Sequence, residues 1–117
     1  FRRVLFRSMK SSRKQKPHYN LKDIKQKLRE DKVLIQGNAL QYALMDFNWT
    51  RNDIIRCYLK LNGNHFYKSD FKNDPEYEPL DIYKADPIYG ESVYTHFYVS
   101  KDQKHKDKVI INSFKRI

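Results

Sequence analysis

One predicted strand in the C-terminal third of the chain carries the side chains best suited to chemistry. Successive side chains of a strand point to opposite faces, which places Tyr94, His96 and Tyr98 on one face and apolar side chains on the other. Lys68 and Lys115, from two further predicted strands, could join this polar row. A metal-free ribonuclease needs such groups: a base for the 2′-hydroxyl proton, a cation for the phosphorane charge, and an acid for the leaving 5′-oxygen. The row therefore makes RNA cleavage chemically feasible.

The protonation of the two lysines decides which roles they can take. A free lysine has a pKa of about 10.4, but neighbouring cations and partial burial favour its neutral form. A cluster that includes Lys68 and Lys115 could therefore make one lysine a base while the other stays charged. The same pattern is also typical of an ordinary exposed strand face or a binding surface, so both interpretations stay open.

Other kinds of site have weak support in this sequence. The histidines His18, His65, His96 and His105 show no ligand-like spacing with one another or with Cys57, which argues against zinc. With only 3 glycines the chain has no glycine-rich phosphate loop. We expect no metal and no small-molecule cofactor.

Capping residues and hydrophobic periodicity predict the elements that must position the polar row. Asn20 is expected to cap a helix over 21–28, and Asn38 a helix over 39–45. Thr50 and Asp53 form a capping box before a third helix, over 54–59. Strands are predicted at 33–35, 65–69, 80–84, 92–99 and 108–115, with a loop at 70–79 and turns at 86–90 and 100–107. This order predicts an α+β fold, with N-terminal helices packed on one face of an antiparallel sheet.

The formal charge of +10 overstates how basic the folded part is. Residues 1–8 resemble the translation of a sequencing adapter and are set aside as a scar, and residues 9–16 are expected to be a flexible basic arm. The single domain expected over 17–117 keeps a charge of only +3, from 17 basic and 14 acidic side chains. The lone Cys57 argues against a disulfide scaffold, and no apolar run approaches the roughly 20 residues that span a bilayer. We expect a cytoplasmic protein without a membrane segment.

Several short motifs, in a fixed order, resemble one family. They are Pro17-His18-Tyr19, His65-Phe66-Tyr67-Lys68-Ser69, Asp81-Ile82-Tyr83, Gly90-Glu91-Ser92-Val93-Tyr94 and Ser113-Phe114-Lys115. Over nearly all of residues 17–117, the chain resembles the motility quorum-sensing regulator (MqsR) family of type II toxins. The resemblance implies a RelE-like fold and an mRNA interferase that cleaves mRNA without metal or ribosome, typically at GC-containing triplets, until a cognate antitoxin binds it.

The resemblance also implies roles for matched residues. Lys68, Tyr94 and Lys115 stand at positions counted among the family's active-site residues, and we predict them as catalytic. A working assignment makes Lys68 the base or phosphate clamp, Lys115 the cation on the phosphorane and Tyr94 the proton donor. We predict RNA contacts at His96, Tyr67, Tyr83 and Arg116.

The sequence departs from the family pattern at two places near these residues. Pro79-Leu80 stands where members usually carry Trp-Gln, so an active-site glutamine is missing, and His96 stands where a lysine can occur. With a reference pKa near 6.5, His96 could exchange protons at neutral pH. Two other functions stay open: a non-catalytic module that stacks RNA on its tyrosine-rich sheet, and a protein-interaction subunit held through an edge strand such as 33–35.

Overall fold

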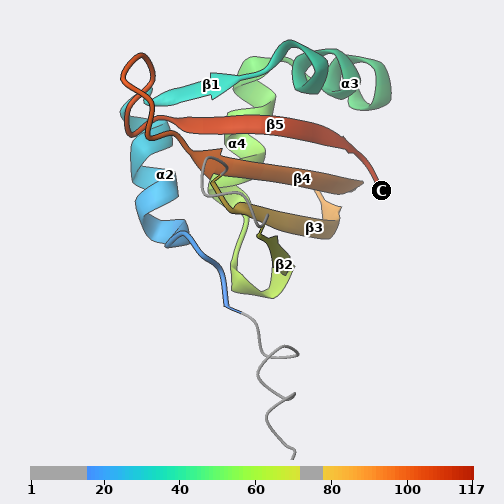
Figure 1. Cartoon of the computed structure of the whole chain (residues 1–117). Helices are drawn as coiled ribbons and strands as arrows, with labels where there is room; N and C mark the ends of the chain where they lie inside the picture. Colours follow the sequence, from blue (N-terminus) through green and yellow to red (C-terminus); the bar gives the residue numbers. More distant parts are fainter. Residues whose placement is uncertain (1–15, 72–77) are drawn as a thin grey trace, which may run out of the picture.

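Five strands form one mixed sheet in the computed structural model, which describes residues 16–71 and 78–117. The strands are β1 (Val33–Ile35), β2 (Phe66–Asp70), β3 (Leu80–Ile88), β4 (Glu91–Val99) and β5 (Val109–Arg116). Their order in the sheet is β1-β5-β4-β3-β2 (Figure 1). Neighbours from β2 to β5 are antiparallel, whereas β1 lies at the edge and pairs with β5 in parallel. The predicted α+β class and the edge strand at 33–35 are confirmed.

Some sequence predictions fall on residues that the structure does not describe. The segment 1–8 and the predicted arm 9–16, apart from Lys16, lie outside the described residues. The same is true of residues 72–77 in the predicted loop 70–79.

Among the described residues, three α-helices precede the four-stranded meander: α2 (Leu21–Arg29), α3 (Gly37–Phe47) and α4 (Arg51–Lys60). A short 3-10 helix, η2 (Gly63–His65), follows α4. The Asn20 side chain caps α2 by accepting from the amides of Lys22 and Asp23, as predicted. The predicted capping box of Thr50 and Asp53 starts α4.

The predicted start of the second helix is wrong. Helix α3 begins at Gly37, and Asn38 lies in its first turn instead of at its N-cap. The Asn38 side-chain amide donates to the backbone oxygen of Asn112 on β5. A tertiary contact therefore uses the side chain that the local sequence pattern assigns to a cap.

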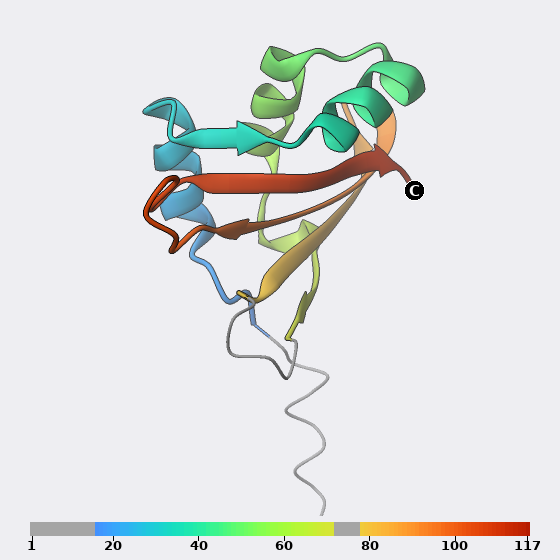
Figure 2. The same cartoon turned by 45° about the horizontal axis from the view of Figure 1, so that its top comes forward.

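The helices are distributed unequally around the sheet. Helices α2 and α4 cover one face, whereas α3 continues from β1 along the edge beside β5 (Figures 1 and 2). The core lies between helices α2 and α4 and the sheet. Its fully buried members include Ile24, Ile54, Tyr58, Tyr83, Val93, Phe97, Ile111 and Phe114. Burial of this apolar surface, at roughly 25 cal/mol per Å², is what holds the helices on this face.

The hairpin between β3 and β4 is tighter than predicted. Strand β3 continues through Pro87 to Ile88, with an irregularity in its pairing between Ala85 and Ile88 that accommodates the proline. The turn is confined to Tyr89 and Gly90, and Gly90 has a φ of +76° that favours glycine. The predicted turn over 86–90 is therefore too long.

A buried carboxylate fastens the start of the described chain to the sheet. Asp81 on β3 is fully buried and accepts from the backbone amides of His18 and Tyr19, at 3.0 and 2.9 Å. It also accepts from the hydroxyl of Ser69 on β2, and the Tyr19 hydroxyl donates to the Pro79 carbonyl at 2.7 Å. These bonds fix the entry to α2 against the β2–β3 edge.

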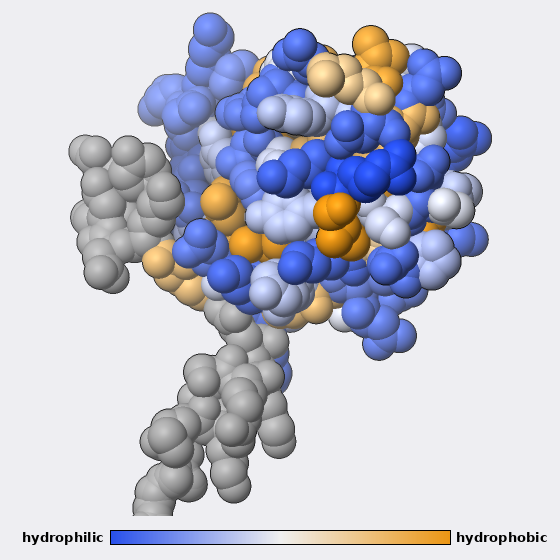
Figure 3. Space-filling model, turned by 90° about the vertical axis from the view of Figure 1, so that its right-hand side faces the viewer, coloured by the Kyte–Doolittle hydropathy of each residue, from blue (hydrophilic) through white to orange (hydrophobic). Residues whose placement is uncertain are grey.

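The surface around the C-terminus is mainly hydrophilic, with hydrophobic residues in separate spots (Figure 3). The large apolar side chains that the described residues expose include Leu44, Met45 and Ile117. No helix among the described residues is long and apolar enough to cross a membrane.

Candidate active site on the outer face of the sheet

The sheet presents a polar surface on the face turned away from α2 and α4, which we call the outer face. On β4, Val93, Thr95 and Phe97 are fully buried against the helices, so the alternating residues Tyr94 and His96 belong to the outer face. Pairing with the neighbouring strands extends this surface. Its polar members are Lys68, Asp70, Lys84, Tyr94, His96, Tyr98, Asn112, Ser113 and Lys115.

The strand register sets a row of three side chains across the sheet. Lys84 lies directly opposite Tyr94, and Tyr94 lies directly opposite Lys115. Because adjacent strands are about 4.8 Å apart, the two lysines flank the tyrosine from either side. The Lys115 Nζ lies 5.3 Å from the centroid of the Tyr94 ring. A tyrosine whose neighbours on both adjacent strands are lysines is an arrangement that can bind an anion and donate a proton to it.

The next row along the strands contains the other predicted residues. Lys68 lies opposite Ile82, Ile82 opposite His96, and His96 opposite Ser113. The rings of His96 and Tyr94 make an edge-to-face contact, with 5.7 Å between centroids. The two rows together bring Lys68, Tyr94 and Lys115 onto one face, with Tyr94 and His96 at its centre.

A bulge in β2 turns Tyr67 toward this surface. The pairing between β2 and β3 shifts between Phe66 and Lys68, which leaves Tyr67 as the extra residue. The Nζ of Lys84 lies 3.9 Å from the centroid of the Tyr67 ring, and the Nζ of Lys68 lies 5.7 Å from it. Tyr67 is 53% exposed and therefore offers a ring on which a base can stack.

Burial shifts the pKa values of Tyr94 and His96 in opposite directions. Partial burial, followed by the charge of Asp70 and the nearby Tyr67, raises the pKa of Tyr94 above its ordinary value of 10.0, which keeps the phenol protonated. Burial also lowers the pKa of His96 below 6.5; the hydrogen bond with Asn112 opposes this and the charge of Lys115 adds to it. At neutral pH the site therefore holds a protonated phenol beside a neutral imidazole.

Two of the predicted RNA contacts lie away from the outer face. Tyr83 is fully buried on the helix-covered face, where it stacks on Phe97, so it has no surface for RNA. Arg116 follows Lys115 and points the other way. It forms an ion pair with Glu91 at 2.8 Å and donates to the Asp46 carbonyl of α3. Strand alternation separates it from the outer face.

Three outer-face residues escaped the sequence prediction: Lys84, Asp70 and Asn112. Lys84 and Asp70 follow the period of two within their own strands, but that period does not say which residue lies opposite Tyr94. Asn112 is the extra residue of a bulge in β5, between the pairs His96–Ser113 and Phe97–Ile111. Its side chain reaches His96 only because of this irregularity, which has no clear signal in the sequence.

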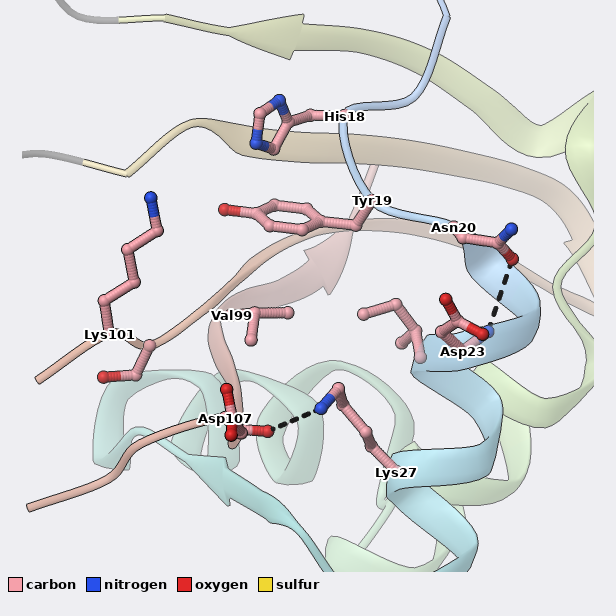
Figure 4. A pocket seen from close by; sticks show the side chains of 10 residues that line it. His18, Tyr19, Asn20, Asp23, Lys27, Val99, Lys101 and Asp107 are labelled. Carbon is pink, nitrogen blue, oxygen red and sulfur yellow. Dashed lines mark hydrogen bonds between the residues drawn. The ribbon is translucent and has the colours of Figure 1, made fainter. Parts of the chain in front are cut away.

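A shallow pocket of about 450 Å³ lies elsewhere, between the start of α2 and the adjoining ends of β4 and β5. Its lining includes His18, Tyr19, Lys101 and Asp107 (Figure 4). The Nζ of Lys27 already donates to the Asp107 carbonyl across it at 3.1 Å. None of the polar outer-face residues line this pocket, so it is separate from the candidate site. Among the described residues, no group of three or more His, Cys, Asp or Glu side chains could hold a metal ion.

The fold and the site define a small α+β protein whose sheet carries helices on one face and a tyrosine between lysines on the other. The family described as "Motility quorum-sensing regulator, toxin of MqsA" matches residues 16–116, nearly the whole chain. The chain belongs to this family, which makes it the toxin of a toxin–antitoxin system and implies an antitoxin of the MqsA kind as its partner. No curated protein matches the chain in a sequence comparison.

Proposed function

We propose that this toxin is a metal-independent endoribonuclease that cleaves mRNA in the cytoplasm and thereby inhibits translation and growth until its antitoxin binds. The observation that carries the proposal is the register of the sheet, which sets Tyr94 directly between Lys84 and Lys115. Lys68 and His96 lie on the same face. These groups supply the cations, the proton donor and the base that cleavage through a 2′-hydroxyl requires.

The reaction begins when a base removes the proton of the 2′-hydroxyl. The 2′-oxygen then forms a bond to the adjacent phosphorus, and the bond from phosphorus to the 5′-oxygen breaks. Lys115 stabilises the negative charge that develops on the phosphorane oxygens, and Lys84 helps to bind the phosphate. Tyr94 donates a proton to the departing 5′-oxygen, a role that its raised pKa supports because the phenol remains protonated. The products are a 2′,3′-cyclic phosphate and a 5′-hydroxyl.

Substrate positioning differs from the family pattern at one point. Leu80 takes the place of the family's glutamine, and it pairs with Asp70 at the end of β2. An apolar side chain cannot form the hydrogen bonds that a glutamine offers. We therefore expect a sequence preference distinct from that of members that keep the glutamine.

The test incubates the purified protein with a mixed-sequence RNA in EDTA, beside a Lys68→Ala/Lys115→Ala double variant. We expect cleavage that resists EDTA and is lost in the double variant, with 2′,3′-cyclic phosphate ends on the fragments. Circular dichroism of both proteins controls for folding. RNA binding without cleavage by the wild-type protein would instead support a non-catalytic RNA-binding module, and EDTA-sensitive cleavage would contradict the metal-independent mechanism.

A further inference from the structure

His96 is held in a defined orientation by the irregularity in β5. Asn112, the extra residue of the bulge, places its Oδ1 at 2.5 Å from the Nδ1 of His96. The backbone around this contact is fixed as well. Asn38 on α3 donates to the Asn112 carbonyl, and the buried Thr95 hydroxyl donates to the Ser113 carbonyl at 2.7 Å. Thr95 in turn shares a 2.6 Å hydrogen bond with Tyr58 of α4.

This contact determines which nitrogen of the neutral ring carries the proton. A carboxamide oxygen can accept a hydrogen bond but cannot donate one. The Nδ1 of His96 must therefore be the donor, and the remaining lone pair of the neutral imidazole lies on Nε2. The orientation of the ring and the identity of the free nitrogen are both set by Asn112.

The charged and titratable groups around the ring come from three strands. Tyr94 on β4 touches the ring, Lys115 on β5 disfavours its protonation, and Asp70 on β2 favours it. Burial, the largest influence on His96, also disfavours the charged form. A neutral ring with a free Nε2 therefore lies beside the row formed by Lys84, Tyr94 and Lys115.

We propose that the Nε2 of His96 is the general base of the reaction and that Asn112 is the positioning residue that fixes its tautomer. This inference rests on the proposed ribonuclease function. In the step, Nε2 takes the 2′-hydroxyl proton while the 2′-oxygen bonds to phosphorus. The bond to the 5′-oxygen breaks as Tyr94 gives that oxygen its proton. Transfer of a proton from the imidazolium through solvent to the Tyr94 phenolate restores both groups.

The assignment gives the histidine and the lysines different roles. With His96 as the base, no lysine has to lose its proton, so Lys68, Lys84 and Lys115 all remain cations for the phosphate. The histidine is also better matched to neutral pH than a lysine, because efficient general bases have pKa values near the working pH.

The tautomer can be measured on the free protein without any RNA. A long-range ¹H–¹⁵N spectrum of the histidine rings shows which nitrogen carries the proton. We expect the Nδ1–H form for His96 in the wild-type protein at neutral pH, and a mixture of both forms in Asn112→Ala. A wild-type ring protonated on Nε2 would overturn the proposed role of Asn112.

Activity is measured as the pH dependence of cleavage of a short mixed-sequence RNA in EDTA. We expect His96→Ala to lose about 10²- to 10⁴-fold in rate. Asn112→Asp puts a carboxylate beside the ring, which raises the pKa of His96. The acidic limb of the pH–rate profile should therefore move to higher pH, by about 1 pH unit or more. The control is His105→Ala, in the turn between β4 and β5, which should follow the wild-type profile.

The two levels of the hypothesis fail in different ways. If the wild-type protein cleaves RNA and His96→Ala cleaves equally well, the base is another group and only this inference is lost. The inference is lost in the same way if Asn112→Asp leaves the acidic limb unmoved. If the wild-type protein does not cleave RNA at all, the proposed function fails and the base assignment fails with it, whatever the ring tautomer.

Discussion

The two faces of β4 have the same backbone but different tasks. Thr95 and Phe97 are fully buried against the helices, whereas Tyr94 and His96, the residues between and beside them, are half-buried on the outer face. The buried face determines the register, because a slip of one residue would turn its apolar side chains outward. Because both faces belong to the same strands, the outer face has the same register, and this register brings its polar side chains together.

The comparison predicts that substitutions on the two faces separate stability from activity. The largest effect is expected for Phe97→Ala, which removes a buried ring that contacts Tyr58 and Tyr83. We expect a loss of about 3–5 kcal/mol in unfolding free energy, measured by urea denaturation. The neighbouring outer-face change Tyr98→Ala is the matched comparison and should cost less. Equal losses from both would mean that the two faces do not differ as described.

Lys115→Met should leave the fold intact and impair the reaction. Removing one preorganised cation from the phosphorane is expected to lower the rate of RNA cleavage by about 10²- to 10³-fold. The unfolding free energy should change by less than about 0.5 kcal/mol, because the side chain is exposed. Lys104→Met, which removes the same charge from the turn after β4, controls for general electrostatics. Similar rate losses in both variants would argue for a diffuse charge effect.

Lys84→Met tests the row of Lys84, Tyr94 and Lys115, in which the place of Lys84 is known only from the strand register. Lys84 lies opposite Tyr94 and over the ring of Tyr67, so its loss should weaken binding of the phosphate more than it slows the chemistry. We expect a rise of about tenfold in KM and a smaller change in kcat, from steady-state cleavage assays. A wild-type KM in this variant would remove Lys84 from the site.

The smallest expected effect is the difference in unfolding free energy between Tyr→Phe substitutions at two buried tyrosines on the helix-covered side. The Tyr58 hydroxyl bonds to Thr95, whereas the buried Tyr83 hydroxyl has no hydrogen-bond partner among the described residues. Tyr58→Phe should therefore cost about 1 kcal/mol, and Tyr83→Phe should be neutral or stabilising by about 1 kcal/mol. Thermal unfolding of both variants measures the difference. A larger loss for Tyr83→Phe than for Tyr58→Phe would contradict this assignment of partners.

Local patterns in the sequence predicted which helices and strands form better than they predicted where each one begins and ends. The caps at Asn20 and Thr50 were predicted because their side chains bond within a few residues of their own position. The cap at Asn38 failed because that side chain bonds instead to Asn112, 74 residues away in the chain. The local pattern did not show that Arg116 lies off the outer face for a similar reason, since its partners Asp46 and Glu91 lie far from it in the chain.

The α+β class, the polar row on β4 and, through the motifs, the family could all be predicted from the order of residues alone. Alternation and capping are local properties, so they can be read from neighbouring residues. The packed fold was needed to show that Tyr94 stands between Lys84 and Lys115, and that Asn112 holds His96. Strand register and bulges depend on how the buried side chains of separate strands pack together. That packing is a property of the whole fold, and it determines which polar groups lie together on the outer face.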